Sequence, residues 1–356
     1  MKYISALFFT LCAINLFAQE LIEPCKFGQP LIDALQDSYT PDNPLGYGPA
    51  RDILYSEIDN NGLELSGIYT NFTVTLDPNE DPSVSAFQNG AGINAEHVYP
   101  QSLGAGNEPA KSDLHNIFPS KVNVNAARGN CPFDEIEDTD TDSWFYLDMQ
   151  SSNIPLTEIE KYSEKDEEDC VFEPREEVKG NIARAMFYFY AIYQSNANAA
   201  DPDYFSLQKE RLFQWHVADP VDAVEKERDS LIALQQGNNN PFIIDSTLAW
   251  RAYFEADASY PVGDPNCYGS TTSVLDLDGN DWVAISSNFV QNELVIYSKK
   301  NKGIALIFDL QGRFVQEAKM KYETRLQVSC LSHGIYILHL HSGDLKKTFK
   351  FLKIKN

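Results

Sequence analysis

The chain has 356 residues, of which 43% are hydrophobic, and its formal net charge at pH 7 is −24. This length and apolar content are enough for a sizeable core and more than one domain. This negative charge excludes the class of proteins that attract nucleic acid through an overall positive charge, because a strongly acidic surface repels phosphates at long range.

The first eighteen residues have the order of a secretory signal peptide. One lysine, Lys2, precedes an apolar run, and the small residue Ala18 closes it. The run is too short to favour a membrane span, and no later stretch is long and apolar enough to be one. We therefore expect residues 1–18 to be removed on export, with no stable membrane insertion; a buried first helix is the alternative.

Export allows the remaining five cysteines to form disulfides. Their count is odd, and the sequence alone does not fix the pairing. None has C-x-x-C spacing, so we do not expect a zinc cluster. The arrangement that we expect is two bridges and one free thiol: Cys131–Cys170, Cys25–Cys267 and Cys330 alone.

Residues 19–256 are expected to form a mixed but mainly helical body. Apolar residues have helical spacing in 30–39 and 48–60, whereas 63–77 is rich in β-formers. Residues 176–194 are apolar over too broad a face to be exposed, which predicts a core helix.

Two amphipathic helices are expected next, over 203–219 and 219–237. In the second, Asp219 is expected to cap the helix, Pro220 to occupy the first turn and Gly237 to close the end.

Residues 94–102, NAEHVYPQS, place a carboxylate beside an imidazole at the end of an expected strand. In the following segment 112–133, SDLHNIFPSKVNVNAARGNCPF, Pro119 is expected in the first turn of a short helix. A strand end, a loop and a short helix can bring three side chains to one place: Glu96, His97 and Asn125.

These three side chains suit hydrolysis of a phosphodiester. Glutamate and asparagine offer the oxygen ligands that Mg²⁺ prefers, and Mn²⁺ or Ca²⁺ are alternatives. An imidazole that binds no metal can take a proton from water near neutral pH, while the metal steadies charge on the phosphate. Arg128, close by in the sequence, is a candidate to hold a phosphate oxygen.

Other polar residues near this motif are expected to support it. We expect His115 to be buried and hydrogen-bonded, and Asp113 to cap a loop. Asn130 is expected to brace the helix end, with contact to the substrate as the alternative. His216 is expected to serve packing.

The charge is unevenly spread. Residues 285–356 contain twelve Lys/Arg and five Asp/Glu, and Lys2 adds one positive charge, so residues 19–284 carry −32. The acidic runs 134–142 and 163–170 are expected to be solvated loops, with calcium binding as the alternative. Three features would offset this charge: high salt that screens it, divalent ions on the acidic loops, or a local basic cleft. The candidate residues for the cleft are Lys111, Lys121, Arg128, Lys179 and Arg184.

Residues 257–284 are rich in Pro, Gly, Ser and Asp, which is typical of a linker. The following residues, 285–356, alternate apolar and polar side chains between Gly, Asn and Ser, which predicts a small antiparallel β-sandwich.

The motif EHVYPQS, followed by DLHNIFPSKVNVNAARGN, resembles the endonuclease I family of secreted, non-specific nucleases with a ββα-metal (His-Me finger) site. VKGNIARAMFYFY and LFQWHVADPVDAVEKERDSLIALQQGNNNPFI resemble helices of the same family. The resemblance implies an α+β fold, a mainly helical body and metal-dependent cleavage of DNA, with RNA as a further substrate. We expect a monomer.

Position by position, the resemblance makes His97 the general base and Glu96 and Asn125 the metal ligands. Family members also use a loop arginine to hold the cleaved phosphate, but the loop LGAGNEPAKSD contains none. Lys111 and Arg128 are the candidates to replace it, and Lys121 is a further candidate for substrate binding.

The strands IFDLQGRFVQE, LSHGIYILHL and KTFKFLKIKN resemble the C-terminal sorting domain of the type IX secretion system. The segment 288–296, NFVQNELVI, departs from the Asn-Pro usual there. The resemblance implies a tail that the secretion machinery reads, and release from the cell or attachment at its surface.

Three functions are alternatives to a polymer-cleaving nuclease. They are a phosphodiesterase for small nucleotides, a calcium-loaded surface module without activity, and a degenerate nuclease that binds without cutting.

Overall fold

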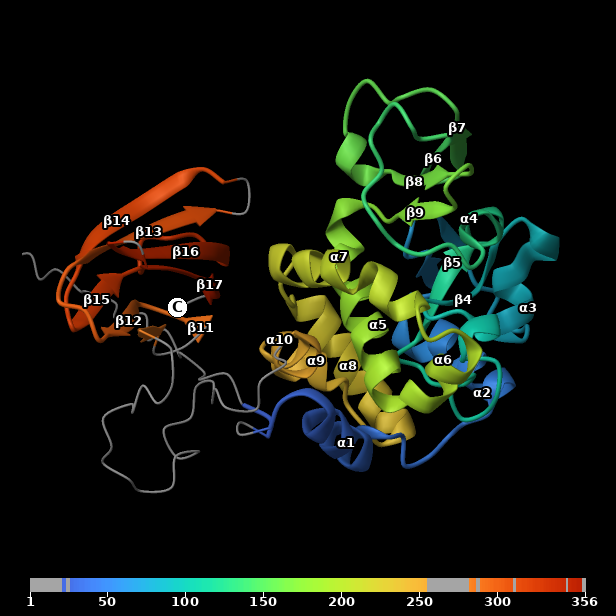
Figure 1. The fold of residues 1–356 in the computed structure, drawn as a ribbon. Helices are drawn as coiled ribbons and strands as arrows, with labels where there is room; N and C mark the ends of the chain where they lie inside the picture. The colour runs from blue at the N-terminus through green and yellow to red at the C-terminus, as the bar shows by residue number, and fades with distance from the viewer. Residues whose placement is uncertain are drawn as a thin grey trace, which may run out of the picture.

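The computed structural model describes residues 21–23, 26–254, 282–285, 289–309, 312–343 and 345–353. The expected signal peptide, most of the expected linker and the expected Cys25–Cys267 bridge lie outside these residues. Figure 1 shows a mainly helical body with small sheets and a separate group of strands, β10–β17. In the described part of the chain, each helix is too short or too polar to cross a membrane.

The helices of the body alternate with small sheets. The α-helices are α1 (Gly28–Tyr39), α2 (Tyr47–Ile53), α3 (Pro82–Phe87), α4 (Val122–Arg128), α5 (Lys179–Ile192), α6 (Gln194–Ala200), α7 (Tyr204–Ala218), α8 (Ala223–Gln236), α9 (Pro241–Ile244) and α10 (Leu248–Tyr253). A π-helical segment, η1 (Leu54–Ile58), continues α2, and the 3₁₀ turns are η2 (Gln88–Gly90), η3 (Gln101–Leu103), η4 (Ile159–Lys161) and η5 (Glu176–Val178).

The strands of the body form three antiparallel sheets. They are β1 (Asn60–Asn61), β2 (Glu64–Ser66) and β3 (Thr73–Thr75); β4 (Ile93–His97) and β5 (Ile117–Lys121); and β6 (Ser143–Tyr146), β7 (Met149–Ser151), β8 (Ser163–Asp166) and β9 (Val171–Glu173). The β6–β9 sheet has the order β7-β6-β8-β9 and lies at one end of the body, beyond α7 (Figure 1).

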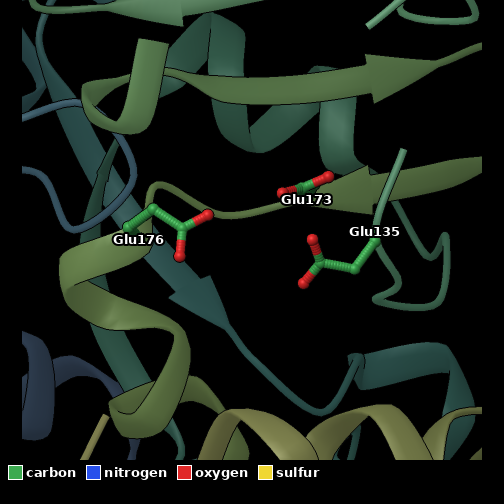
Figure 2. Close-up of side chains that lie close together, drawn as sticks. All are labelled: Glu135, Glu173 and Glu176. Atoms are coloured by element: carbon green, nitrogen blue, oxygen red, sulfur yellow. The ribbon is translucent and has the colours of Figure 1, made fainter. Parts of the chain in front are cut away.

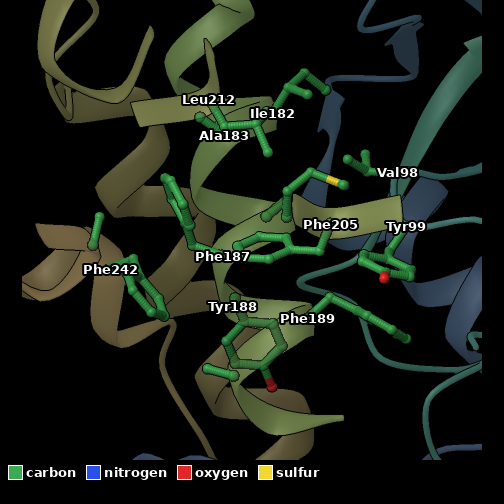
Figure 3. Close-up of a cluster of buried hydrophobic side chains, with 14 of the residues drawn as sticks. Val98, Tyr99, Ile182, Ala183, Phe187, Tyr188, Phe189, Phe205, Leu212 and Phe242 are labelled. Atoms are coloured by element: carbon green, nitrogen blue, oxygen red, sulfur yellow. The ribbon is translucent and has the colours of Figure 1, made fainter. Parts of the chain in front are cut away.

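Helix α5 forms the core of the body, as its broad apolar face predicts. Every residue of α5 except Asn181 and Tyr190 is buried. Phe187 stacks on Phe242 and Tyr253, at centroid distances of 5.8 and 5.4 Å. Figure 3 shows that Val98 and Tyr99, which follow β4, reach the same cluster. The strand that carries Glu96 and His97 is therefore anchored directly in the main core.

Strands β4 and β5 pair with Glu96 opposite Phe118 and His97 opposite Ile117, and α4 follows β5 directly. This is the expected ββα arrangement, but Pro119 lies in β5, so its expected place in the first turn of the helix is wrong. The Pro119 carbonyl accepts a hydrogen bond from the Ile68 backbone N–H at 2.8 Å. In an antiparallel strand the nitrogen faces the same side as the carbonyl, so the missing N–H of Pro119 costs the β4–β5 ladder nothing.

Two other local expectations are corrected. Helix α8 is capped by Asp222, whose carboxylate accepts from the Glu225 N–H at 2.8 Å. Asp219 does not cap it, because its carboxylate accepts from the Gly180 N–H at 2.9 Å. Residues Ser163–Asp166 are not a solvated loop but a buried strand, β8, paired with both β6 and β9.

The C-terminal strands pack as a small sandwich of two sheets. They are β10 (Val283–Ile285), β11 (Phe289–Val290), β12 (Glu293–Ser298), β13 (Gly303–Asp309), β14 (Phe314–Met320), β15 (Glu323–Gln327), β16 (Gly334–Ser342) and β17 (Leu345–Lys353). The sheet orders are β10-β12-β15 and β11-β17-β16-β13-β14, antiparallel except for the β11–β17 pair. Alternate residues of both sheets share one hydrophobic core, as the period-two pattern predicts.

The expected Cys131–Cys170 disulfide is present, and Cys330 is a free, exposed thiol. The bridge joins the loop after α4 to the turn between β8 and β9, across a sequence separation of 39 residues. Closing a loop of this length stabilises the folded chain by about 4 kcal/mol in the chain-entropy account.

We expect the Cys131→Ser/Cys170→Ser variant to lose about 2–4 kcal/mol of unfolding free energy in the helical body. Urea denaturation followed by helical circular dichroism measures this loss. Cys330→Ser is the matched control and should change the midpoint little, because its thiol is exposed and has no disulfide partner. Equal midpoints for the double variant and this control would contradict the expectation.

Candidate active site

His97 ends β4 and is nearly buried, with its side-chain nitrogens facing two different partners. Nε2 lies 2.8 Å from the Lys111 carbonyl oxygen, and Nδ1 lies 3.2 Å from the amide nitrogen of Gln101. A carbonyl only accepts, so Nε2 carries the proton and Nδ1 is the basic nitrogen. Burial lowers the pKa of His97 to about 4, which keeps the ring neutral and able to accept a proton.

Glu96 precedes His97 and is also buried. Its Oε1 accepts a hydrogen bond from the Tyr69 hydroxyl at 2.8 Å and lies 3.2 Å from an Arg128 guanidinium nitrogen. Within the described residues, Oε2 has no hydrogen-bond partner. Burial raises the pKa of Glu96 to about 7, although Arg128 and Tyr69 favour the ionised form. A further cation beside Oε2 would favour the ionised form of this carboxylate more strongly.

Asn125 lies in the middle of α4 and faces β4. Its amide nitrogen donates to the Asn94 side-chain oxygen at 2.9 Å and to the Ala95 carbonyl at 3.1 Å. Both donor hydrogens are thus used by residues just before Glu96. The amide oxygen has no hydrogen-bond partner among the described groups, so it remains available as a ligand.

Glu96 and Asn125 each offer the kind of oxygen ligand that a Mg²⁺-type ion prefers. Each presents one oxygen that has no hydrogen-bond partner in the described part of the chain, while its other polar atom is fixed by neighbours. Two protein oxygens with the remaining positions left to water and phosphate are typical of magnesium sites. The donor set thus fits the expected ion.

Arg128 is 1% exposed and does not face solvent. Its guanidinium pairs with Glu96 and donates to the carbonyls of His97 at 3.2 Å and Val98 at 2.7 Å. It also donates to the Tyr204 hydroxyl at 3.1 Å. A guanidinium engaged in this way positions Glu96 and the end of β4, and it is poorly placed to hold a phosphate.

Helix α2 contributes residues to the site that the sequence analysis did not identify. The Tyr47 ring lies 5.4 Å from the His97 ring. The Lys111 ammonium and the Arg51 guanidinium lie 5.0 and 4.8 Å from the centre of that same ring. The available signal was the spacing of Tyr47 and Arg51, four residues apart, because such residues share a face once the helix predicted over 48–60 begins one residue earlier.

Lys121 is turned away from this group. Its ammonium donates to the Asp148 carbonyl at 2.8 Å and lies 4.6 Å from the centre of the Phe72 ring. Of the expected substrate-binding lysines, the structure thus brings Lys111 close to His97 and leaves Lys121 engaged with the hairpin of β6 and β7.

The expected supporting residues form a buried polar network. The Asp113 carboxylate accepts from the hydroxyls of Tyr188 and Tyr193, both at 2.8 Å, and from the His115 backbone N–H at 3.0 Å. His115 donates through Nε2 to the Asn238 carbonyl at 3.0 Å. The loop before β5 is thereby fixed to α5 and to the turn after α8.

Two further residues occupy supporting positions. Asn130 is exposed and donates to the Ser102 hydroxyl at 2.7 Å, so it ties the end of α4 to the turn η3. His216 is buried, donates to the Ser246 carbonyl at 2.9 Å and packs against Phe187, so it belongs to the core.

Several acidic groups of the body are paired with buried cations. Figure 2 shows Glu135, Glu173 and Glu176 converging, and their oxygens are close enough to hold a metal ion. However, the Lys179 ammonium contacts all three, at 3.1, 2.7 and 2.5 Å, and so occupies the cation position. Arg184 pairs with Glu225 through two contacts of 2.6 Å. The expected contribution of Lys179 and Arg184 to a basic cleft is therefore wrong.

Comparisons with known proteins identify two families in the chain. Residues 32–247 match the family model described as Endonuclease I, and residues 286–355 match the one described as Secretion system C-terminal sorting domain. The first match contains all of the side chains that surround His97 in the structure. The sorting domain indicates a protein that is secreted or held at the cell surface.

Curated relatives match part of the chain. An extracellular ribonuclease of Bacillus amyloliquefaciens is 32% identical over 165 residues, which are 42% of this chain and 50% of the relative. An extracellular deoxyribonuclease of Aeromonas hydrophila is 31% identical over 134 residues, which are 37% of this chain and 49% of the relative. The chain thus spans about half the length of the curated relatives it matches.

Proposed function

Because this chain belongs to the endonuclease I family, we propose that it is a secreted, metal-dependent endonuclease that hydrolyses phosphodiester bonds of DNA with little sequence preference. RNA is a further proposed substrate, since the relatives include both ribonucleases and deoxyribonucleases. We also propose a nuclease domain over residues 19–256 and a sorting domain over 285–356.

The observation that carries this proposal is the state of His97. Its Nε2 hydrogen is bound to the Lys111 carbonyl, so the basic Nδ1 is fixed in direction. We propose that Nδ1 takes a proton from the attacking water, in the place where Gln101 now donates to it. The low pKa of about 4 ensures that the base is free at neutral pH.

Glu96 and Asn125 are the proposed metal ligands. A bound Mg²⁺-type ion would steady negative charge on the phosphate and the leaving oxygen. Neighbouring side chains position both ligands. Tyr69 and Arg128 contact the Glu96 carboxylate, and Asn94 accepts a hydrogen bond from the Asn125 amide. The metal would also favour the ionised form of Glu96.

The experiment that tests the function is nicking of supercoiled plasmid by the full chain with Mg²⁺, beside an EDTA control. We expect conversion to nicked and then linear DNA only when metal is present. A parallel assay with single-stranded RNA assigns the sugar preference. A folded chain that cleaves neither polymer with Mg²⁺ or Mn²⁺ would refute the proposal.

Replacing Asn125 with alanine tests the ligand assignment. We expect the Mg²⁺ concentration for half-maximal nicking to rise at least about tenfold, because one of two protein ligands is lost. Asn123→Ala is the matched control, since Asn123 is an exposed asparagine in the same helix. If both variants need the same Mg²⁺ concentration, Asn125 is not a ligand.

A further inference from the structure

A pocket of about 600 Å³ lies beside the proposed metal ligands. It is formed by α2, the π-helical segment that continues it, α3 and the start of β4. Asn94 lines this pocket and also accepts the hydrogen bond that fixes Asn125, at 2.9 Å. A group bound in the pocket would therefore be next to the site of cleavage.

Two polar side chains of the pocket have buried atoms without partners. Tyr55 is 1% exposed, and its hydroxyl has no hydrogen-bond partner within the described residues. The Nε of Arg51 is likewise buried and has no partner there. Leaving a buried donor unsatisfied costs about 1–3 kcal/mol, so both atoms point to an acceptor group that binds from outside.

Among the described residues Arg51 also forms no ion pair with a carboxylate, in a body where most cations do. Nine of the fifteen Lys/Arg in the described residues 26–254 form ion pairs with carboxylates. The six that form none are Arg51, Lys111, Lys121, Lys165, Lys209 and Lys226. Among these, Arg51 and Lys111 share the Tyr47 ring, which contacts the ring of His97.

We propose, resting on the nuclease function above, that Arg51 binds a backbone phosphate of the nucleic-acid substrate and that the pocket receives the adjoining nucleotide. A guanidinium matches the geometry of phosphate oxygens in two parallel hydrogen bonds. Arg51 thereby supplies, from α2, the arginine that the loop between β4 and β5 lacks. Lys111, whose ammonium lies on the same Tyr47 ring, adds a second positive charge near the proposed base.

The lining of the pocket sets the direction of the nucleotide. Phe87 is 44% exposed there and offers a ring on which a base can stack. Asp81 also lines the pocket, and its carboxylate accepts from the Val84 N–H at 3.1 Å. Because the Arg51 guanidinium attracts a phosphate and the Phe87 ring can stack on a base, we place the phosphate at Arg51 and the base against Phe87.

The salt dependence of binding tests this assignment. Full-length chain carrying His97→Ala, which holds DNA without cutting it, is titrated onto a labelled DNA duplex in Mg²⁺ at several KCl concentrations. Each phosphate contact contributes about 0.9 to the slope of log K against log salt. We expect Arg51→Gln to reduce the magnitude of the slope by about that amount and to weaken binding about tenfold.

Two further variants make the result specific. Lys209→Gln removes a cation that also lies on an aromatic ring, Phe254 at 5.4 Å, and should leave the slope unchanged. Arg51→Lys keeps the charge, so it should retain most of the slope. If Arg51→Gln behaves like Lys209→Gln, or if the duplex does not bind at all, the inference is overturned.

Plasmid nicking by the chain with His97 intact separates this inference from the proposed function. If that chain nicks DNA and Arg51→Gln leaves the KM and the salt slope unaltered, only the role of Arg51 is refuted. If the chain does not nick DNA, the nuclease function fails, and the phosphate subsite that rests on it fails too.

Discussion

Replacing His97 with alanine is expected to lower the rate of phosphodiester cleavage by about a hundred- to ten-thousand-fold, the range for loss of a general base. The expectation follows from the direction of Nδ1. The proton on Nε2 is committed to the Lys111 carbonyl, so the opposite nitrogen is presented in one orientation. Single-turnover nicking of plasmid at saturating Mg²⁺ measures the loss without interference from product release.

The matched control for His97 is His216. Both histidines are almost fully buried, and both donate through Nε2 to a backbone carbonyl, that of Lys111 or of Ser246. His216→Ala should therefore cost similar stability, on the order of 1 kcal/mol for the hydrogen bond, without the loss of rate. Equal losses of rate in the two variants would mean that His97 acts only through the fold.

The pH dependence gives a second readout for the same residue. A histidine whose pKa is lowered to about 4 stays unprotonated above that pH and is a competent base throughout the neutral range. The rate should therefore not fall through protonation of His97 between pH 8 and pH 5, as it would for a histidine of ordinary pKa near 6.5. The profile should be measured at saturating Mg²⁺, so that metal binding does not limit the rate.

Local patterns predicted the elements that carry the site, because the signals lie within a few residues. The strand ending at His97, the core helix α5 and the left-handed glycine cap of α8 at Gly237 follow from periodicity and capping preferences. Pro119 was misplaced because a missing N–H is tolerated both in the first turn of a helix and at a free strand edge. The strand position is recognised only from a contact that is distant in the sequence, the hydrogen bond from the Ile68 N–H to the Pro119 carbonyl.

The roles of the charged residues were harder to predict, because their partners are distant in the sequence. Arg184 meets Glu225, and Lys179 meets Glu135 from the loop after α4, so neither is available to a substrate. Arg128 was a candidate to hold a phosphate oxygen, yet this last residue of α4 is buried against β4. Conversely, Arg51 became a candidate for phosphate binding only once the structure showed that, among the described residues, no carboxylate forms an ion pair with it.

Replacing Arg128 with methionine is expected to lower the unfolding free energy of the helical body by about 3–5 kcal/mol, because the Glu96 charge is left buried without its partner. The carbonyls of His97 and Val98 lose their donors at the same time. Urea denaturation measures the change. A residue that served only to hold phosphate would leave stability unaltered and change only binding, so the result separates the two roles.

The double variant Arg128→Met/Glu96→Gln tests whether the ion pair itself is responsible. Glutamine keeps an acceptor for the Tyr69 hydroxyl but carries no charge, so the penalty for an unpaired buried carboxylate disappears. We expect the double variant to be more stable than Arg128→Met alone, with a coupling energy of about 1–3 kcal/mol. Strictly additive losses would contradict the pairing. A coupled result would mean that Arg128 favours the charged form of the proposed metal ligand before any ion or substrate binds.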